Sequence, residues 1–259
     1  MAEESGKIKI NSIDRALDVL IYIYKKQQPV RLADMARDMQ ESKSTLYRVV
    51  STLENKGFLT KDPESGKYWL GLKLLAIGSC VQDHLGIGSA ARPYMHELYE
   101  EVNEVINLSV LQLQAVDVPK IVVVEKEESN RQVLRANPSI GAFSNCHSSA
   151  AGKCLIAFTG QYDVFHVEPY PLTHYTEHTI TSWDKFLDEI RSVQEKGYAL
   201  DLEEREYGLT CVGAPILDRS GKAIAALSIA GPSYRMNSRL DELIDKTKTE
   251  ARKISEMYR

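Results

Sequence analysis

The stretch from Arg31 to Phe58, RLADMARDMQESKSTLYRVVSTLENKGF, decides how the N-terminal part of the chain folds. Apolar residues recur at helical spacing on both sides of a polar break, Gln40-Glu41-Ser42. Ser42 stands where its hydroxyl can cap the second helix by accepting a backbone N–H. The pattern predicts two short helices joined by a tight turn, a helix–turn–helix.

One face of the second predicted helix carries two cations and several hydroxyls but no carboxylate. Its residues are Lys43, Ser44, Thr45, Tyr47, Arg48, Ser51 and Thr52. Such groups suit phosphate oxygens and base edges in a major groove. A solvated helix pair in an ordinary bundle would show the same pattern, so this stretch alone leaves both interpretations open.

A β-hairpin is predicted directly after this stretch. Two short β-prone runs, 58–60 and 67–70, flank the turn-forming segment Asp62-Pro-Glu-Ser-Gly66. With a further helix predicted to begin at Ser12, three helices and a hairpin make a winged helix–turn–helix, which favours DNA binding over the solvated bundle. The hairpin carries two cations that we expect to lie along a DNA backbone, Lys61 and Lys67.

The composition is that of a globular protein with a sizeable core, since 43% of the 259 residues are hydrophobic and 26% are charged. The net charge of −4 is unevenly divided. Residues 1–73 hold 13 Lys and Arg against 10 Asp and Glu, whereas the remainder holds 19 against 26. A basic N-terminal part on an acidic body is typical of a chain in which one domain contacts phosphate and the other has a different task.

Signals for membranes, secretion and catalysis are absent from the sequence. No apolar run approaches the roughly 18 residues that span a membrane, and the N-terminus lacks the apolar region of a signal peptide. We therefore expect a cytoplasmic protein without membrane contact. The phosphate-binding, dinucleotide-binding and zinc-protease motifs do not occur either, so we expect neither a cofactor nor a metal.

The four cysteines are expected to be free thiols, because none is spaced as in a zinc site or a disulfide framework. Cys146-His147 places a possible nucleophile beside a base. Adjacent residues on a strand point to opposite faces, however, so we expect no catalytic pair there and no catalytic residue elsewhere.

The chain after the hairpin alternates helices and strands. A short apolar helix from Leu72 is predicted to link two domains, and Gly86 to Gly88 should end it. Further helices are expected at 89–103, 148–158, 182–196 and 239–258, and strands at 105–113, 120–125, 132–135, 209–217 and 222–229. Such a mixture predicts an α+β sensor-like domain with an antiparallel sheet.

Two segments of this second domain have the composition of a binding site. Small residues at 148–152 enter a predicted helix, where uncovered N–H groups can bind an anion, although small residues also allow close helix–sheet packing. Asp201 to Glu206 is predicted to be an acidic loop, mostly solvated. Cys211 and Ser228 lie in the two following strands, where either ligand contact or core packing would explain them.

Several motifs, in this order and spacing, resemble the IclR family of bacterial transcriptional regulators along nearly the whole chain. In the N-terminal part they are SIDRALDVL (12–20), SKSTLYR (42–48), LENKGFL (53–59) and YWLGLKL (68–74). In the C-terminal part they are HSSAAGK (147–153), GLTCVGAP (208–215) and AALSIAGP (225–232).

The resemblance implies a winged helix–turn–helix domain at 1–71, a dimerising linker helix at 72–86 and a GAF-like effector domain at 87–259. Members of the family are dimers or tetramers that bind double-stranded operator DNA near catabolic genes. Their effectors are small organic acids such as keto acids, sugar acids or aromatic acids. We therefore expect a ligand-responsive regulator, a repressor, rather than an enzyme.

The resemblance also implies site residues. The effector carboxylate would lie on backbone amides at Ala150 and Ala151, with side chains from Asp201, Cys211 and Ser228. Pocket walls would include Val133, Ala136, Ser144 and Leu209. The expected DNA contacts are Arg31, Lys43, Ser44, Thr45, Tyr47, Arg48 and Lys67.

The sequence departs from the family pattern at three places. Ala230 replaces a serine of the effector site, and Gln40-Glu41 replaces a glycine in the helix–turn–helix. Arg31 stands where a serine or threonine commonly caps a helix, and at the helix start it would contact phosphate. Two alternatives remain open from the residues: the C-terminal domain is an enzyme with Cys146 or Cys211 as nucleophile, or the winged helix mediates protein contacts only.

Overall fold

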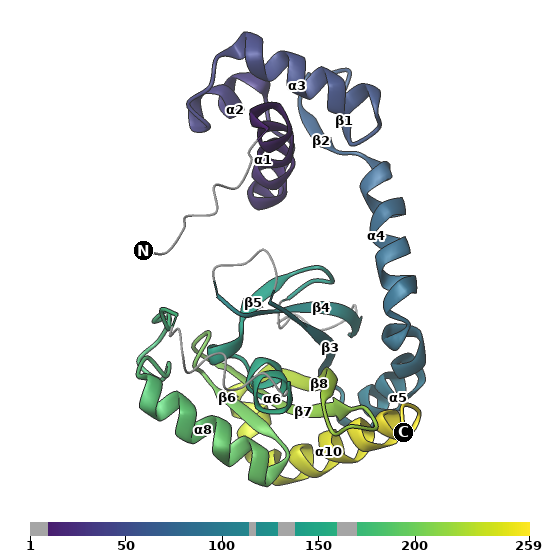
Figure 1. The fold of residues 1–259 in the computed structure, drawn as a ribbon, viewed down its shortest axis with the longest axis vertical. Coiled ribbons are helices and arrows are strands. Elements are labelled where there is room, and N and C mark those ends of the chain that lie inside the picture. Colours follow the sequence, from purple (N-terminus) through teal and green to yellow (C-terminus); the bar gives the residue numbers. More distant parts are fainter. Residues whose placement is uncertain (1–9, 114–117, 129–137, 160–169) are drawn as a thin grey trace, which may run out of the picture. The chain divides into compact units, whose positions relative to one another are not determined.

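The computed structural model describes residues 10–113, 118–128, 138–159 and 170–259. The chain divides into two units, Met1–His84 and Leu85–Arg259 (Figure 1). Each unit encloses its own apolar cores. No helix within the described ranges is long and apolar enough to cross a membrane.

The first unit is a three-helix bundle with a two-stranded wing, followed by a further helix. Its elements are α1 (Asn11–Lys26), α2 (Leu32–Asp38), α3 (Lys43–Asn55), β1 (Leu59–Lys61), β2 (Tyr68–Leu70) and α4 (Leu72–Leu85). The bundle and wing share one core, in which Val19 of α1, Met35 of α2 and Leu46 of α3 are fully buried. Helix α1 begins one residue before the predicted Ser12.

The turn between α2 and α3 forms without the usual glycine. The Gln40 N–H bonds the Arg37 carbonyl at 3.3 Å, and the Glu41 N–H bonds the Ala36 carbonyl at 3.0 Å. These are the two bonds of a Schellman cap, which requires a left-handed residue at the position that Gln40 occupies with φ +56°. Ser42 then caps α3, as predicted, by accepting the Thr45 N–H at 3.1 Å.

The wing follows the predicted turn chemistry. Strands β1 and β2 pair antiparallel. Asp62 closes the turn because its carboxylate accepts both the backbone N–H and the hydroxyl of Ser65, each at 2.6 Å. A bridge between Val30 and Tyr68 ties β2 to the start of α2.

The second unit is a six-stranded antiparallel sheet with helices on both faces. The sheet order is β5-β4-β3-β8-β7-β6. Its strands are β3 (Val105–Gln112), β4 (Lys120–Glu127), β5 (Phe143–Asn145), β6 (Ala199–Leu202), β7 (Leu209–Leu217) and β8 (Ala223–Pro232). The helical segments are α5 (Ile87–Val102), η1 (Cys146–Ser148), α6 (Ala150–Phe158), α8 (Trp183–Lys196), α9 (Ser233–Met236), η2 (Asn237–Arg239) and α10 (Leu240–Glu256). The predicted α+β class with an antiparallel sheet is confirmed.

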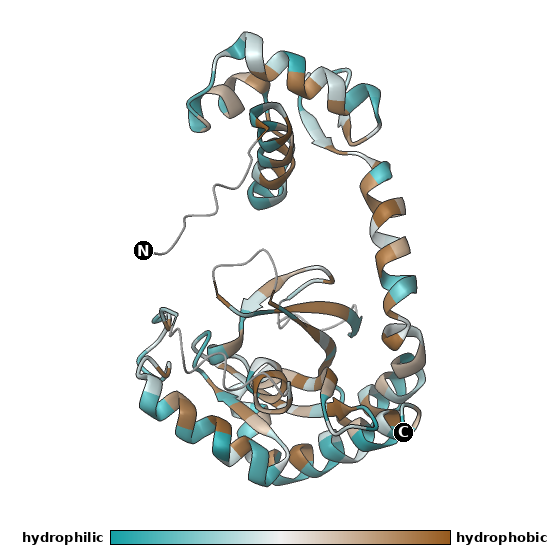
Figure 2. Cartoon of the chain, viewed as in Figure 1, coloured by the Kyte–Doolittle hydropathy of each residue, from teal (hydrophilic) through white to brown (hydrophobic). Residues whose placement is uncertain are grey.

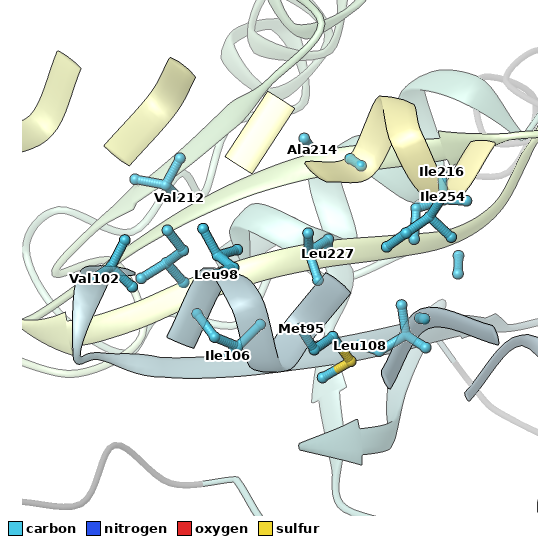
Figure 3. Close-up of a cluster of buried hydrophobic side chains, with 14 of the residues drawn as sticks. Met95, Leu98, Val102, Ile106, Leu108, Val212, Ala214, Ile216, Leu227 and Ile254 are labelled. Atoms are coloured by element: carbon cyan, nitrogen blue, oxygen red, sulfur yellow. The ribbon is translucent and has the colours of Figure 1, made fainter. Parts of the chain in front are cut away.

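Alternation along the strands gives each face of the sheet its own core. Figure 3 shows one face, where Ile106 and Leu108 of β3 and Leu227 of β8 pack with α5 and α10. The opposite face, with Ala226 of β8, packs against α6 and α8. The hydropathy colouring in Figure 2 shows apolar and polar positions interleaved along the helices. The odd-numbered residues of β7, such as Cys211 and Gly213, face α6. The candidate effector residues lie on this side of the sheet.

Three sequence predictions need correction. Asp201 and Leu202 belong to strand β6, not to a loop. Cys146 and His147 lie in a 3-10 turn, so the argument from strand alternation does not apply to them. Helix α5 begins at Ile87, directly after the left-handed Gly86 (φ +66°), and so earlier than the predicted Ser89. The strand predicted at 132–135 lies outside the described residues.

Replacing Gln40 by glycine should stabilise the first unit. The left-handed conformation costs a non-glycine residue about 1–2 kcal/mol, and the greater flexibility of glycine in the unfolded chain offsets about 0.5–1 kcal/mol of that gain. We expect Gln40→Gly to raise the free energy of unfolding by about 0.5–1 kcal/mol. Urea unfolding followed by Trp69 fluorescence in a Trp183→Phe background reports on this unit, because the chain has two tryptophans.

The matched control is Gln28→Gly, at an exposed position where φ is not positive. There glycine only adds freedom to the unfolded chain, so stability should fall slightly. Equal effects of the two substitutions would contradict the strain at Gln40.

Candidate functional sites

Helix α3 presents the cationic, hydroxyl-bearing face that its sequence predicts. Leu46 and Val50 are fully buried in the bundle, which turns Lys43, Tyr47 and Arg48 to solvent. Tyr47 is 56% exposed although it is aromatic. Within the described chain neither Lys43 nor Arg48 takes part in an ion pair, so both charges are available to an anion.

The start of α3 gathers three hydroxyls around the helix cap. Ser42 Oγ lies 3.0 Å from Ser44 Oγ and donates to Thr45 Oγ1 at 2.9 Å. Ser44 is exposed and Thr45 is half-buried. Hydroxyls at a helix N-terminus, where the dipole is positive, favour a phosphate group.

Four of the predicted DNA contacts line two separate hollows. Thr45 and Arg48 line a groove of about 630 Å³ between α1 and α3. Arg31 and Lys67 line a separate hollow of about 420 Å³, which has no residue of α3 in its lining and includes Asp34 and Asp38. Arg31 occupies the cap position of α2 but makes no side-chain cap. The Val30–Tyr68 bridge explains why Arg31 and Lys67 come together, since each is next to a bridged residue.

In the second unit, the strand register brings the candidate effector residues onto one face of the sheet. Cys211 pairs with Asp201 on one side and Ala230 on the other. Two residues along, Gly213 pairs with Ser228, which in turn pairs with Asn107. Residues that pair directly point to the same face, so these form two adjacent rows. Ala230, where the family has serine, leaves the first row without that hydroxyl.

The start of α6 lies directly on Gly213. A Cβ at Gly213 would come within 2.8 Å of the Ala150 carbonyl carbon and 2.9 Å of the Ala151 nitrogen. Ser149 caps the helix by accepting the Gly152 N–H at 3.4 Å. Close packing of small residues is therefore present, and it places the first N–H groups of α6 above the row that contains Ser228.

Lys153 anchors this helix start through a buried cluster of charges. Its side chain is 1% exposed, and its ammonium donates to the Leu200 carbonyl at 2.8 Å. It also pairs with Glu204 Oε1 at 2.5 Å and Glu189 Oε1 at 3.3 Å. Burial raises the pKa of Glu204 to about 7, against the opposing effect of the Lys153 ammonium. The cluster ties α6 to α8, β6 and the loop after β6.

Asp201 extends this cluster to the sheet face. Its Oδ1 accepts the backbone N–H groups of Glu204 at 2.8 Å and Arg205 at 3.4 Å, which shapes the loop after β6. The side chain is buried, and burial raises the pKa of Asp201 to about 6. The acidic segment predicted to be mostly solvated thus buries two of its carboxylates, Asp201 and Glu204.

The cysteines do not have the chemistry of nucleophiles. Burial raises the pKa of the Cys146 and Cys211 thiols well above the ordinary value, so both remain protonated at neutral pH. The neighbouring His147 is fully buried, and its Nε2 lies 2.9 Å from the Thr173 carbonyl rather than acting on a thiol. This arrangement argues against the cysteine-dependent alternative.

Three polar side chains of this unit were not predicted to be effector contacts. Asn107, His147 and Arg205 each have a buried atom without a hydrogen-bond partner in the described chain. The Arg205 guanidinium lies 4.1 Å from the centre of the Tyr175 ring. Their positions depend on the strand pairing and on the path of the loop, which the sequence does not reveal. The one sequence feature that could have indicated a polar site here is a lone asparagine in an apolar strand. Ser144 and Leu209 are half-buried, whereas Val133 and Ala136 lie outside the described residues.

Known protein families match both units. The model of the IclR helix-turn-helix domain matches residues 12–63, and that of the bacterial transcriptional regulator IclR C-terminal domain matches residues 80–256. The chain belongs to the IclR family. Its members are transcriptional regulators with a DNA-binding helix–turn–helix, and the chain is accordingly a regulator rather than an enzyme.

Individual relatives extend over most of the chain. The HTH-type transcriptional regulator XynR of Escherichia coli is 32% identical over 234 residues, 90% of this chain and 89% of that protein. KdgR of the same organism is 34% identical over 232 residues, 89% of this chain and 86% of that protein. Among solved structures, the IclR protein of Thermotoga maritima shares 27% identity with a TM-score of 0.78, covering 96% of this chain and 99% of that one.

A further structure shows the same fold with a ligand bound. It is an IclR homologue from Microbacterium hydrocarbonoxydans in complex with 4-hydroxybenzoate. It shares 22% identity with a TM-score of 0.81, covering 95% of this chain and 98% of that one.

Asp201 should make stability depend on pH. Folding raises the pKa of Asp201, so the folded state binds this proton more tightly than the unfolded state does. The resulting stabilisation is complete below about pH 4 and is lost as pH rises through about 6. A shift of about two units corresponds to about 3 kcal/mol. Asp201→Asn can still accept the two loop N–H groups, so it should gain up to about 3 kcal/mol relative to the native chain between pH 4 and pH 7.

Urea unfolding at several pH values, followed by Trp183 fluorescence in a Trp69→Phe background, measures this difference in the second unit. Titrating groups that do not interact with Asp201 cancel in the comparison, whereas Glu204, whose pKa the Asp201 charge helps to raise, adds to the difference. If the free energies of unfolding of Asp201→Asn and of the native chain changed in parallel with pH, burial would not raise the pKa of Asp201.

Proposed function

We propose that this chain is a repressor of a catabolic operon that leaves its operator when a small organic acid binds the second unit. In this scheme, residues 1–71 bind DNA, 72–86 form a dimerising linker and 87–259 sense the effector. The observation that carries the proposal is the exposed face of α3, on which Lys43 and Arg48 stand without ionic partners in the described chain. A solvated bundle helix has no need of such a carboxylate-free face.

On DNA, the residues of α3 take different roles according to their chemistry. Arg48 can donate two hydrogen bonds to the edge of a guanine. Ser44 and Thr45 at the helix start, with Lys43, would hold phosphate, and Tyr47 would contact phosphate or a thymine methyl group. Lys67 of the wing and Arg31 at the start of α2 would contact the backbone beside this helix.

The effector would bind at the start of α6. Its carboxylate would accept the N–H groups of Ala150 and Ala151, facing Asp201, Cys211 and Ser228 on the sheet. The homologue of the same fold that holds 4-hydroxybenzoate supports a small acid as the class of ligand. Binding must favour one arrangement of the DNA-binding units over another, which typically involves about 1–3 kcal/mol. An acid that raises the melting temperature but leaves operator affinity unchanged would contradict this coupling.

The linker helix α4 supports a homodimer, or a tetramer built from dimers. No residue of α4 is buried in the chain. Leu74, Ile77, Val81 and Leu85 recur at i, i+3, i+7 and i+11, the spacing of a helix–helix seam. Two of them, Ile77 and Val81, are 45% and 58% exposed. A second copy of α4 would cover this seam, and two copies of α3 would then reach two half-sites of an operator.

Arg48→Ala should weaken operator binding by about 1–3 kcal/mol and relax specificity at one base position, because the guanidinium reads a base edge. An operator duplex selected from a random library, titrated in a mobility-shift assay, gives the affinity. Lys25→Ala on α1 serves as the charge-matched control and should have less effect. Unchanged operator affinity of the Arg48 variant would refute its role.

Salt titration of the same complex separates DNA binding from a protein-contact role of the winged helix. Phosphate contacts release counterions, so the logarithm of the association constant should fall steeply and linearly with the logarithm of salt concentration. A chain that bound only proteins would show no saturable binding to the duplex.

Ile77→Glu should disrupt the dimer, since it places a charge in the apolar seam of α4. We expect a monomer by analytical ultracentrifugation and a loss of at least tenfold in operator affinity, because one chain cannot hold both half-sites (each tenfold is about 1.4 kcal/mol). Ala76→Glu, on the opposite side of the helix, is the control and should remain dimeric. A dimeric Ile77 variant would exclude this seam as the interface.

A further inference from the structure

Four buried side-chain atoms without a hydrogen-bond partner lie on segments that lead into, or run beneath, the start of α6. Within the described chain these atoms are Asn107 Oδ1, His147 Nδ1, Ser148 Oγ and Arg205 Nη1. Folded proteins pair nearly all such atoms with protein, water or ligand. His147 and Ser148 directly precede the helix, and Arg205 bonds Asp201 through its backbone. Their presence on the segments before and beside α6 and on the sheet beneath it indicates a polar occupant.

The protonation of His147 follows from its neighbour. The Thr173 carbonyl can only accept, so the His147 Nε2 that lies 2.9 Å from it carries the proton. Burial lowers the pKa of His147, which keeps the ring neutral and leaves Nδ1 as a bare acceptor. Asn107 Oδ1 is an acceptor as well. The occupant must therefore supply hydrogen-bond donors, which a carboxylate or a ketone lacks.

The positions of these groups suit an elongated ligand. Asn107 is 4% exposed and lies two strands from Gly213, with Ser228 between them in register. Two strand spacings place Asn107 roughly 10 Å from the backbone beneath the first turn of α6. Ser228 pairs with both Asn107 and Gly213, so its side chain lies on the same face of the sheet, between them. A two- or three-carbon acid at Ala150 and Ala151 would not reach Asn107.

We propose that the effector is a polyhydroxylated acid, with its carboxylate at the start of α6 and its hydroxyl groups donating to Asn107 Oδ1 and His147 Nδ1. This rests on the proposed effector site and names the chemical class that the site selects. The unpartnered Arg205 Nη1 and the first N–H groups of α6 serve the acidic end. Asn107 and Ser228 serve the hydroxyl-bearing end. A site built around hydroxyl groups strongly disfavours analogues that lack them, because its buried acceptors then stay unpaired.

Matched ligands test this class directly on the full-length chain. Gluconate and xylonate are compared with hexanoate and pentanoate, which have the same chain lengths without hydroxyl groups, and with pyruvate. Sorbitol provides the hydroxyl groups without the carboxylate. Calorimetry gives the dissociation constants, and release of the operator duplex gives the functional response. We expect at least tenfold tighter binding of one of the two hydroxy acids than of its unhydroxylated partner, and no binding of sorbitol.

The variant Asn107→Leu removes the acceptor while keeping the number and branching of the side-chain heavy atoms. It should reduce the preference for the hydroxy acid at least tenfold while leaving the weaker binding of the unhydroxylated acid in place. Thr247→Val is the control, since Thr247 is equally buried but bonds within α10, to the Leu243 carbonyl. Should the Asn107 variant not fold, the ligand preferences of the native chain and of His147→Leu decide the question.

The outcomes separate this proposal from the proposed function. If pyruvate or an unhydroxylated acid binds as tightly as the hydroxy acids and releases the operator, the effector site stands and the polyhydroxylated class is wrong. If Asn107→Leu keeps the full preference for hydroxyl groups, Asn107 does not read them. If none of the acids binds the chain or affects the operator, the effector proposal itself fails.

Discussion

The close contact between the start of α6 and Gly213 is the constraint on which the second unit depends. Any side chain at Gly213 would collide with the Ala150–Ala151 peptide, and a Cβ at Gly152 would come within 2.5 Å of the Cys146 backbone. Two glycines thus fix the height of the helix start above the sheet and the path of the chain that enters it. The rows of Asp201, Cys211 and Ser228 belong to the candidate effector site only because this helix start lies beside them.

The Lys153 cluster links the start of α6 to α8 and to the loop after β6. Isolated charges in a protein interior are costly, so the fully buried ammonium requires Glu204 and Glu189 as partners. Glu204 in turn is bound through its backbone to Asp201. A displacement of α6 would therefore move charges on α8 and on the loop after β6. Removing one partner is expected to destabilise far more than an exposed ion pair would, because a buried charge would remain uncompensated.

How much of the fold and of the candidate site could be predicted from the sequence depends on whether each interaction is local or long-range. Local signals worked: the Ser42 cap, the turn at Asp62 and the alternation along β7 each depend on a few neighbouring residues. Strand β6 was missed because four residues are too few for a period to show. The pairing of Asn107 with Ser228, the burial of Lys153 and the common hollow of Arg31 and Lys67 depend on long-range register. Helix periodicity carries no information about them.

The unpartnered atoms around α6 give a physical basis for a response to ligand. Each buried polar atom left without a partner costs about 1–3 kcal/mol, and several lie on the segments beside and beneath α6. A ligand that pairs with them gains much of that free energy, but only in the conformation in which Asn107, His147 and the start of α6 face one another. Regulation of DNA binding typically requires a difference of about 1–3 kcal/mol between two arrangements. One or two such hydrogen bonds, present in one arrangement and absent in the other, would supply a difference of the size that the proposed coupling requires.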